Sequence, residues 1–337
     1  MKIIYFAFKH RYRFKDLNNF LHSRVYGKYL LINLAGPLKH WLALILIKFK
    51  IGIPISCDGR PLLDEKTRGL NFFIRGTNLN IPTNFRLLTN NIVSISHPLL
   101  DNKDVFQVYP LDIKKTRINN NPKIIFMSSI NIDIIDKEKK IWIKYKEAIL
   151  KDFTIIDQIN FWKECLPNEE IKFINKNYRV VKLFLRFEII KHLKEKFKEN
   201  FILIGSDWNK YDIESLPSNY NIKKNNNIYK GNICLDTGSL EGSSSLYSRS
   251  NQIIESGGLI IQCSQIDSKK QWKDLSNKIL FQNFLSLDSV IQKLLNDNIY
   301  SNKILDDIYC NFLYSNKLTE KNFDIFLKNH KYITNAS

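Results

Sequence analysis

Short apolar runs alternate along the chain with longer segments of helical periodicity. In the second half, runs rich in Ile, Leu and Phe fall at 123–127, 201–204, 233–235 and 259–261. The segments between them, at 139–150, 180–199 and 246–256, place apolar side chains at helical spacing. Short apolar runs bounded by turn residues are typical of buried strands, and their alternation with helices indicates an α/β fold.

The first half of the chain begins with the same kind of apolar run, at residues 1–8. Three further strands are predicted at 53–57, 70–75 and 91–96. A polar, proline-bounded segment at 109–122 then indicates a linker. We therefore predict an N-terminal α/β domain at 1–115, a C-terminal domain at 122–300 and terminal helices at 301–337.

The most apolar region of the chain, 30–55, contains the run Trp41–Ile47 with lysines on both sides. This run is too short to span a bilayer. One interpretation is a buried helix of the N-terminal domain. The other is a helix lying at a membrane surface, with Trp41 and the flanking lysines at the level of the lipid headgroups. The second interpretation would make an anionic membrane surface a partner of the protein.

Four further expectations concern the second half. Residues 153–156 are predicted to form a strand, 225–227 a loop, and 279–295 a strand that turns into a helix capped near Ser286. The helix at 180–199 is amphipathic, and we expect its Lys and Arg side chains to form a solvated face.

The stretch from 230 to 262 is the most informative part of the sequence. It reads as a strand, a loop of small residues, a helix, the pair Gly257-Gly258 and a second strand, with Ser243 or Ser244 as the helix N-cap. Such a βαβ unit places the loop at the carboxyl end of the first strand. Backbone N–H groups and a helix N-terminus attract anions such as a diphosphate at that position.

The residues of this unit resemble the donor-sugar half of the GT-B glycosyltransferases. The resemblance lies in Gly238-Ser239-Leu240-Glu241-Gly242 at the turn, Tyr247-Ser248-Arg249 at the helix start and Ile254–Gly258 at its end. It implies two Rossmann-like α/β domains facing a cleft, and the N-terminal domain predicted here is smaller than is usual in that family. It also implies a nucleotide-sugar donor, with loop N–H groups holding the diphosphate and an acidic residue of the helix holding the ribose.

This resemblance and the predicted strand ends together define a candidate donor site. Its residues are Ser128, Ser129, Gly205, Gly238, Ser239, Glu241, Ser243, Ser244, Tyr247, Arg249 and Glu255. Helix N-termini and cationic side chains can stabilise the leaving diphosphate, so the transfer would need no metal and no further cofactor. The acceptor would be a surface glycan or a glycolipid of the lipopolysaccharide type.

An inverting enzyme would also need a general base from the N-terminal domain. Asp58 and His97 follow predicted strands, and His10 lies in a basic loop after the first strand. These three residues are the candidates, in the order Asp58, His97, His10. Two of them have a simpler explanation: Asp58 can serve only to make the turn with Gly59, and His97 can be a loop residue with no role.

Composition and charge leave other classes open. The chain has 337 residues, 44% of them hydrophobic and 25% charged, and a formal net charge of +18. That charge favours an anionic partner, or it reflects a composition rich in Lys, Asn and Ile. Because the basic residues are dispersed and form no RNA-binding signature, nucleic acid is the less favoured partner. A sugar-nucleotide epimerase and a non-catalytic α/β protein remain alternatives.

The five cysteines are scattered, with no C-x-x-C pair, and the histidines form no metal-binding motif. Cys234 and Cys263 fall in predicted strands and are expected to be buried thiols in a reducing compartment. The first strand begins at the N-terminus and does not resemble a signal peptide. We therefore expect a cytoplasmic protein, peripheral on the inner face of the membrane if the Trp41 helix binds lipid.

Overall fold

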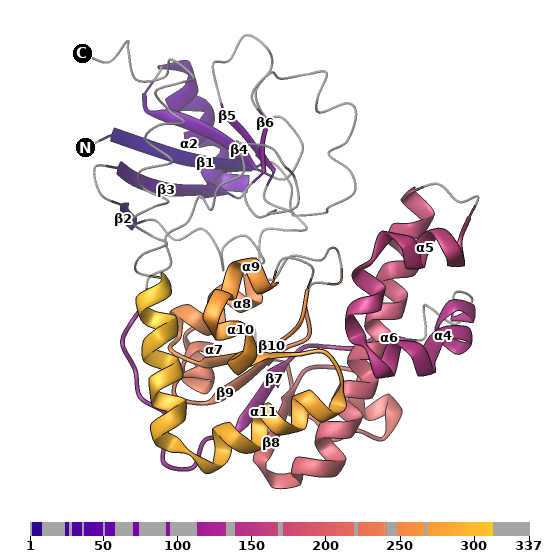
Figure 1. Ribbon diagram of the computed structural model, residues 1–337. Helices are drawn as coiled ribbons and strands as arrows, with labels where there is room; N and C mark the ends of the chain where they lie inside the picture. The colour runs from indigo at the N-terminus through magenta and orange to yellow at the C-terminus, as the bar shows by residue number, and fades with distance from the viewer. Residues whose placement is uncertain are drawn as a thin grey trace. The chain divides into compact units, whose positions relative to one another are not determined.

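The chain divides into two compact units in the computed structural model (Figure 1). The N-terminal unit comprises Met1–Leu111 with Phe312–Ser337, and the C-terminal unit comprises Asp112–Asn311. In the first, the structure describes residues 2–8, 24–26, 29–35, 37–49, 51–57, 70–73 and 92–94. In the rest of the chain it describes 113–132, 139–167, 171–218, 222–238, 240, 248–265 and 268–312.

The N-terminal unit contains a six-stranded sheet in the order β2-β3-β1-β4-β5-β6. Its strands are β1 (Lys2–Phe8), β2 (Arg24–Tyr26), β3 (Tyr29–Ala35), β4 (Ile53–Cys57), β5 (Leu70–Phe73) and β6 (Ile92–Ser94). All neighbours are parallel except β2 and β3, which form an antiparallel pair. The strands predicted from the apolar runs of this half are confirmed.

Helix α2 (Pro37–Lys48) follows β3 and contains the predicted apolar run. Ala43 is fully buried and packs in a cluster with Leu34 of β3. On another side of the helix Trp41 is 68% exposed. The interpretation of this run as a buried helix is therefore correct for one face only.

The C-terminal unit contains five parallel strands in the order β11-β10-β9-β7-β8. They are β7 (Ile124–Met127), β8 (Phe201–Ile204), β9 (Ile233–Asp236), β10 (Leu259–Cys263) and β11 (Leu280–Phe281). Every residue of β7, β9 and β10 is buried. The continuous apolar runs predicted this for the apolar positions, whereas the burial of the polar Asp236 and Gln262 was not predicted. The α/β class with a parallel sheet is confirmed.

The order of the strands determines where a ligand can enter. From β7 the chain moves to β8 on one side, and it then returns past β7 to β9 on the other. At such a reversal the connections leave in opposite directions and open a crevice at the carboxyl ends of the two central strands. The switch point of this sheet is between β7 and β9.

The connections between the strands of the C-terminal unit are mostly helical (Figure 1). They are α4 (Lys140–Lys151), η3 (Phe153–Asp157), α5 (Ile159–Cys165), α6 (Ile171–Phe197), η4 (Lys198–Asn200), η5 (Trp208–Tyr211), α7 (Ile222–Tyr229), α8 (Ser248–Glu255), α9 (Ser268–Trp272), η6 (Lys273–Leu275), α10 (Ser276–Ile279) and α11 (Phe284–Asn296). A last helix spans 298–312. Of these, α6 and α8 position the residues of the candidate site.

Two local predictions are wrong. Residues 153–156 form the 3₁₀ helix η3, because the Asp152 side chain accepts a hydrogen bond from Thr154 N at 2.9 Å and starts a helical turn. Residues 225–227 belong to helix α7 instead of a loop. Asn has a low helix propensity, but packing against α8, where Gln252 donates to Asn226 Oδ1 at 3.3 Å, outweighs it.

The predicted strand and helix at 279–295 are confirmed. Strand β11 leads into α11, whose N-cap is Asn283. The Asn283 side chain accepts from Ser286 N at 2.9 Å, and Asn283 N donates to Ser286 Oγ at 3.1 Å. This reciprocal pair is a capping box, so Ser286 completes the cap three residues into the helix.

Candidate functional site

The candidate site lies at the carboxyl ends of β7 and β9, on either side of the switch point. Ser128 and Ser129 follow β7, while Thr237 and Gly238 follow β9. Small residues and hydroxyl groups at this edge allow a ligand to approach the backbone closely. Of the predicted donor-site residues, Ser128, Ser129 and Gly238 are therefore brought to one edge of the sheet.

Arg186 of α6 joins the two segments across the switch point. Its guanidinium donates to Ser128 Oγ at 3.0 Å, to Thr237 Oγ1 at 3.0 Å and to the carbonyl oxygen of Gly238 at 3.2 Å. Arg186 is only 5% exposed. Hydrogen bonds from a charged donor are stronger than neutral ones, and the planar guanidinium constrains the geometry of all three. Arg186 thus fixes the spacing of the two segments and brings a positive charge to this edge.

Lys182, one helical turn earlier, is buried beside the same edge. Its ammonium lies 3.2 Å from Asp157 Oδ1, with both side chains at most 2% exposed, and donates to Gln265 Oε1 at 2.8 Å. Tyr178 donates its hydroxyl hydrogen to Asp157 Oδ1 at 2.7 Å. Asp157 Oδ2 makes no hydrogen bond among the described residues. Burial therefore raises the pKa of Asp157, and the attraction of Lys182 and the hydrogen bonds offset this only in part.

Asp236, at the end of β9, shapes the turn that carries Gly238. Its carboxylate is fully buried and accepts from Gly238 N at 2.9 Å and from Gln262 Nε2 at 2.8 Å. Gln262 in turn accepts from Trp272 Nε1 at 2.9 Å. Gly238 has a φ of +83°, and a Cβ there would lie 2.4 Å from Gln265 Nε2. Glycine suits this position, because it adopts a positive φ without strain and has no Cβ to collide with Gln265.

Three serines form a second group of hydroxyls where β7 and β8 end. Ser129 Oγ accepts from Ser206 N at 3.0 Å, and it lies 2.8 Å from Ser206 Oγ and 3.1 Å from Ser218 Oγ. Ser129 and Ser206 are exposed. This group can exchange hydrogen bonds with a polar ligand, since each hydroxyl both donates and accepts.

Gly205, another predicted donor-site residue, has a packing role at this edge. A Cβ there would lie 2.0 Å from the carbonyl oxygen of Ser128, so glycine allows the ends of β7 and β8 to approach. Its N–H donates to Leu216 O at 2.9 Å, and its carbonyl accepts from Ser215 Oγ at 3.0 Å. These bonds already use the backbone groups of Gly205 within the protein.

Arg249 lies in the first turn of α8, near the switch point. Its guanidinium carbon is 5.6 Å from the centre of the Phe126 ring in β7, and that of Arg186 is 6.0 Å from the same ring. Two cationic groups from different helices therefore approach one buried side chain of the central strand. Glu255 ends the same helix. At about 1.5 Å per residue it lies about 9 Å along the axis from Arg249, away from the switch point.

The remaining predicted residues lie outside the described part of the chain. They are the candidate bases Asp58, His97 and His10, and the donor-site residues Ser239, Glu241, Ser243, Ser244 and Tyr247. Their roles stay predictions.

Sequence reasoning missed Lys182, Arg186, Asp157 and Gln265. The expectation of a solvated basic face on this helix is wrong at Lys182 and Arg186, which are 3% and 5% exposed. A signal was present, because both interrupt a run of apolar residues at 180–190 instead of lying on a polar stripe. The residues Val181, Leu183 and Leu185 within that run are buried.

A scan against protein-family models gives no match for this chain, and a search of curated proteins gives none either. The functional argument therefore rests on the residues themselves.

Two of the cysteines in the described part of the chain lie in strands of the sheet. Cys234 and Cys263 are buried in β9 and β10, as predicted. Burial raises the pKa of Cys263 to about 12 and that of Cys234 well above its ordinary value, so both thiols stay protonated near neutral pH. Within the described residues, no group of three His, Cys, Asp or Glu side chains could hold a metal ion.

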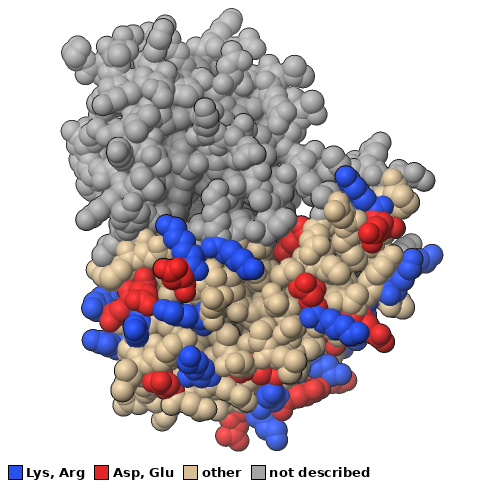
Figure 2. All heavy atoms as spheres, viewed as in Figure 1, with Lys and Arg blue, Asp and Glu red and all other residues tan. Residues whose placement is uncertain are grey.

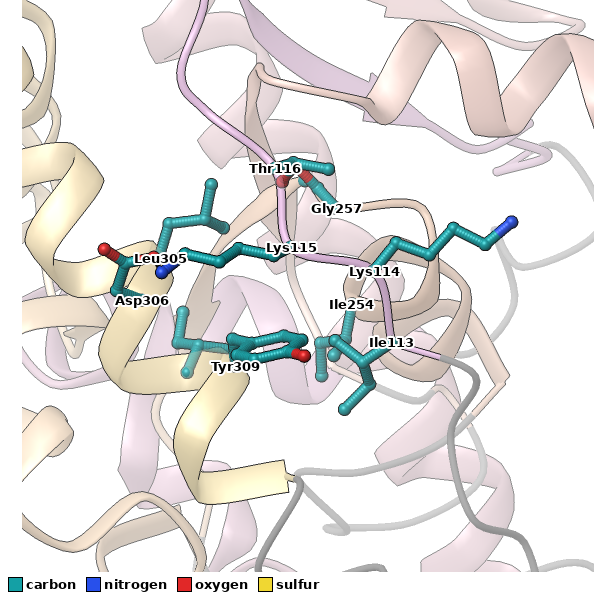
Figure 3. A pocket seen from close by; sticks show the side chains of 11 residues that line it. Ile113, Lys114, Lys115, Thr116, Ile254, Gly257, Leu305, Asp306 and Tyr309 are labelled. Atoms are coloured by element: carbon teal, nitrogen blue, oxygen red, sulfur yellow. Dashed lines mark hydrogen bonds and ion pairs between the residues drawn. The ribbon is translucent and has the colours of Figure 1, made fainter. Parts of the chain in front are cut away.

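A small pocket lies at the amino end of β10, beside the segment 113–116 (Figure 3). Thr116 Oγ1 donates to the carbonyl of Gly257 at 2.9 Å, and Lys115 forms an ion pair with Asp306 at 3.3 Å. Gly257 has a φ of +74°, and the Thr116 side chain occupies the space that a Cβ would need. These polar contacts attach the first segment of the unit to α8 and to the last helix, and the pocket is separate from the switch point.

Proposed function

We propose that the protein is a glycosyltransferase of the GT-B type. Its C-terminal unit binds the diphosphate of a nucleotide-sugar at the switch point between β7 and β9. The sugar is transferred to a surface-glycan or lipopolysaccharide-type acceptor held by the N-terminal unit, across a cleft between the two. The reaction uses the nucleotide-sugar as donor substrate and needs no metal.

The observation that carries this proposal is the Arg186 network. A buried guanidinium holds Ser128 and Thr237 in fixed positions on either side of the switch point. Arg249 and the first turn of α8 approach the same place. A crevice with hydroxyls, cationic groups and a helix N-terminus suits an anionic, hydroxyl-rich ligand such as a sugar diphosphate.

The same features suit the chemistry of transfer. When the bond to the anomeric carbon breaks, negative charge grows on the leaving diphosphate. Fixed positive groups stabilise that charge without having to reorganise during the reaction. In this proposal the C-terminal unit supplies leaving-group stabilisation. A general base, if the reaction inverts, comes from Asp58, His97 or His10.

Ligand binding tests the proposal first. A bound ligand raises thermal stability by mass action, so UDP, GDP, CMP and dTDP can be compared at equal concentrations. We expect one of the four to raise the melting temperature in the wild type and much less in Arg249→Ala. The exposed Lys191 of α6 provides a control variant, Lys191→Ala, that keeps the shift. No shift with any of the four would contradict the proposal.

An activity assay then distinguishes a glycosyltransferase from an epimerase and from a non-catalytic protein. The matching nucleotide-sugar, incubated with the protein, should release nucleotide faster when acceptor glycolipid is added. Interconversion of two sugar nucleotides without release would instead identify an epimerase. Binding without either reaction would identify a non-catalytic protein.

The structure gives less support to nucleic-acid binding. On the face drawn in Figure 2, Lys and Arg side chains of the C-terminal unit lie among Asp and Glu side chains. A nucleic-acid interface concentrates basic residues on one face or stripe. Binding to DNA or RNA that falls steeply with salt would favour this alternative.

A further inference from the structure

Helix α2 presents an apolar surface to solvent. Trp41, Leu42, Ile45 and Phe49, the residue just after the helix, are 68%, 47%, 48% and 65% exposed. We call these four residues the α2 apolar face. Trp41, Ile45 and Phe49 recur every four residues, and Phe49 N still bonds to Ile45 O at 3.0 Å, so the three side chains share one side of the helix. Ala43, on the opposite side, is buried against the sheet.

The α2 apolar face lies apart from the described core of the N-terminal unit. In that core Ala43 and Leu46 of α2 pack with Leu34, Ile3 and Ile32, and Trp41 and Phe49 remain exposed. Single exposed apolar side chains are common on soluble proteins, but neighbouring large ones mark an interaction surface. The nucleotide-sugar site proposed above is built from the C-terminal unit, so it gives the α2 apolar face no role.

The charge around the face indicates the kind of partner. From Leu17 to Cys57 the sequence has no Asp or Glu, while its basic residues are Arg24, Lys28, Lys39, Lys48 and Lys50. Lys48 is exposed in the last turn of α2, next to Phe49. An aromatic and aliphatic strip bordered by lysines matches the boundary between the acyl chains and the anionic headgroups of a bilayer.

We infer that the α2 apolar face docks the protein onto an anionic lipid bilayer. Trp41 and Phe49 enter the headgroup boundary, and the neighbouring lysines contact acidic headgroups. The inferred contact is peripheral, through one face of a single helix. No described helix is long and apolar enough to cross a membrane. A second copy of the chain suits this face less well. A symmetric contact would bring the lysines of both copies to one interface, where like charges repel each other.

The tryptophans make the docking measurable in the unmodified protein. The chain has five, and Trp142, Trp162, Trp208 and Trp272 are each at most 5% exposed. Trp41 therefore dominates any change in fluorescence that lipid contact causes. We expect vesicles containing phosphatidylglycerol to shift the emission to the blue, and brominated lipid in those vesicles to quench it. Both effects should decline as salt rises, because salt screens the attraction of the lysines.

Co-sedimentation with the same vesicles measures the contribution of each side chain. Trp41→Ser should weaken binding about tenfold, given the usual value of burying a large apolar side chain. Lys48→Gln should weaken it about fivefold and reduce its dependence on salt. The control is Leu285→Ser in α11, which removes an apolar side chain that is 81% exposed elsewhere, and it should bind like the wild type.

Three results would overturn the inference. The first is binding to pure phosphatidylcholine vesicles as strong as to those with phosphatidylglycerol. The second is a full-length protein that ignores anionic vesicles at low salt. The third is a dimer in sedimentation velocity that Trp41→Ser converts to a monomer, which would assign the face to a second copy. Because these assays use no nucleotide, their outcome is independent of the proposed transferase activity.

Discussion

Helices α2 and α6 depart from the usual distribution of side chains in opposite ways. Helix α2 exposes Trp41 and Ile45, which are large and apolar, while α6 buries Lys182 and Arg186, which are charged. Burying a charge costs free energy unless it is paired, and exposing an aromatic ring forgoes the gain from burying it. Neither distribution is the one that burial alone favours, so we expect each to serve the surface or crevice where it occurs.

The two helices also differ in what holds the unusual side chains. In α6 each buried cation contacts oxygen atoms from other parts of the unit. Lys182 pairs with Asp157 and donates to Gln265. Arg186 donates to Ser128 and Thr237. In α2 the apolar side chains project into solvent. Substitutions of the two buried cations should therefore affect folding and ligand binding together, whereas those in the α2 apolar face should affect only the interaction with a partner.

The largest effect is expected at Lys182. Lys182→Met removes the cation opposite Asp157 and leaves a buried carboxylate without its partner. Breaking a buried pair in this way costs about 3–5 kcal/mol of unfolding free energy. Urea denaturation of the variant measures the loss. The double variant Lys182→Met with Asp157→Leu should recover most of it, and Lys191→Met on the exposed side of α6 should lose little.

The loss at Lys182 should also depend on pH. The pKa of Asp157 is raised from 3.8 by burial, and removing Lys182 raises it further because the attraction of the ammonium is lost. A raised pKa favours the folded state at pH below 3.8, and this advantage disappears as pH rises through the folded-state pKa. The deficit of the single variant should thus widen from acidic to neutral pH. A deficit that stays constant with pH would show that Asp157 does not titrate in this way.

A second test concerns Arg186. Arg186→Lys keeps the charge but cannot reach three acceptors, so it should lower the unfolding free energy by about 3 kcal/mol, the value of one or two charged hydrogen bonds. We also expect weaker nucleotide binding, because the segments after β7 and β9 lose their fixed spacing. Calorimetric titration with the nucleotide found in the screen measures it. Normal nucleotide affinity in a well-folded Arg186→Lys protein would show that the Arg186 hydrogen bonds do not contribute to nucleotide binding.

Arg249 of α8 is partly buried, and it should show the behaviour of a ligand-binding residue. Arg249→Ala is expected to weaken nucleotide binding by about 1.5–2 kcal/mol, the value of a charged hydrogen bond, with a smaller change in unfolding free energy. Titration calorimetry and urea denaturation of the same preparation distinguish the two effects. If stability falls and affinity does not, Arg249 serves contacts within the protein instead of the ligand.

The smallest effect on folding is expected at Trp41. Trp41→Ser should leave the unfolding free energy within about 0.5 kcal/mol of the wild type, as is usual for exposed positions. Thermal denaturation without lipid measures it, and lipid binding of the same variant should be impaired. A large loss of stability would mean that the Trp41 ring packs in the core, and the comparison of an exposed α2 face with the buried cations of α6 would then be wrong.

Much of the fold was determined by local sequence. Continuous apolar runs such as 124–127 and 259–261 predicted buried strands, because a strand that is covered on both faces carries apolar residues on both. The glycine pair 257–258 likewise predicted, from the local sequence, where α8 ends. Where local signals were weak, as at 153–156 and 225–227, a cap or a neighbouring helix decided the conformation.

The composition of the candidate site was decided by the tertiary structure. The sequence placed Ser128 and Gly238 at strand ends, and parallel pairing then brought the two ends together. Helical periodicity showed that Lys182 and Arg186 share a side of α6, one turn apart, but it could not show what faces that side. Their partners Gln265 and Thr237 lie 83 and 51 residues away. Contacts over such separations depend on the order of the strands, which no local pattern encodes.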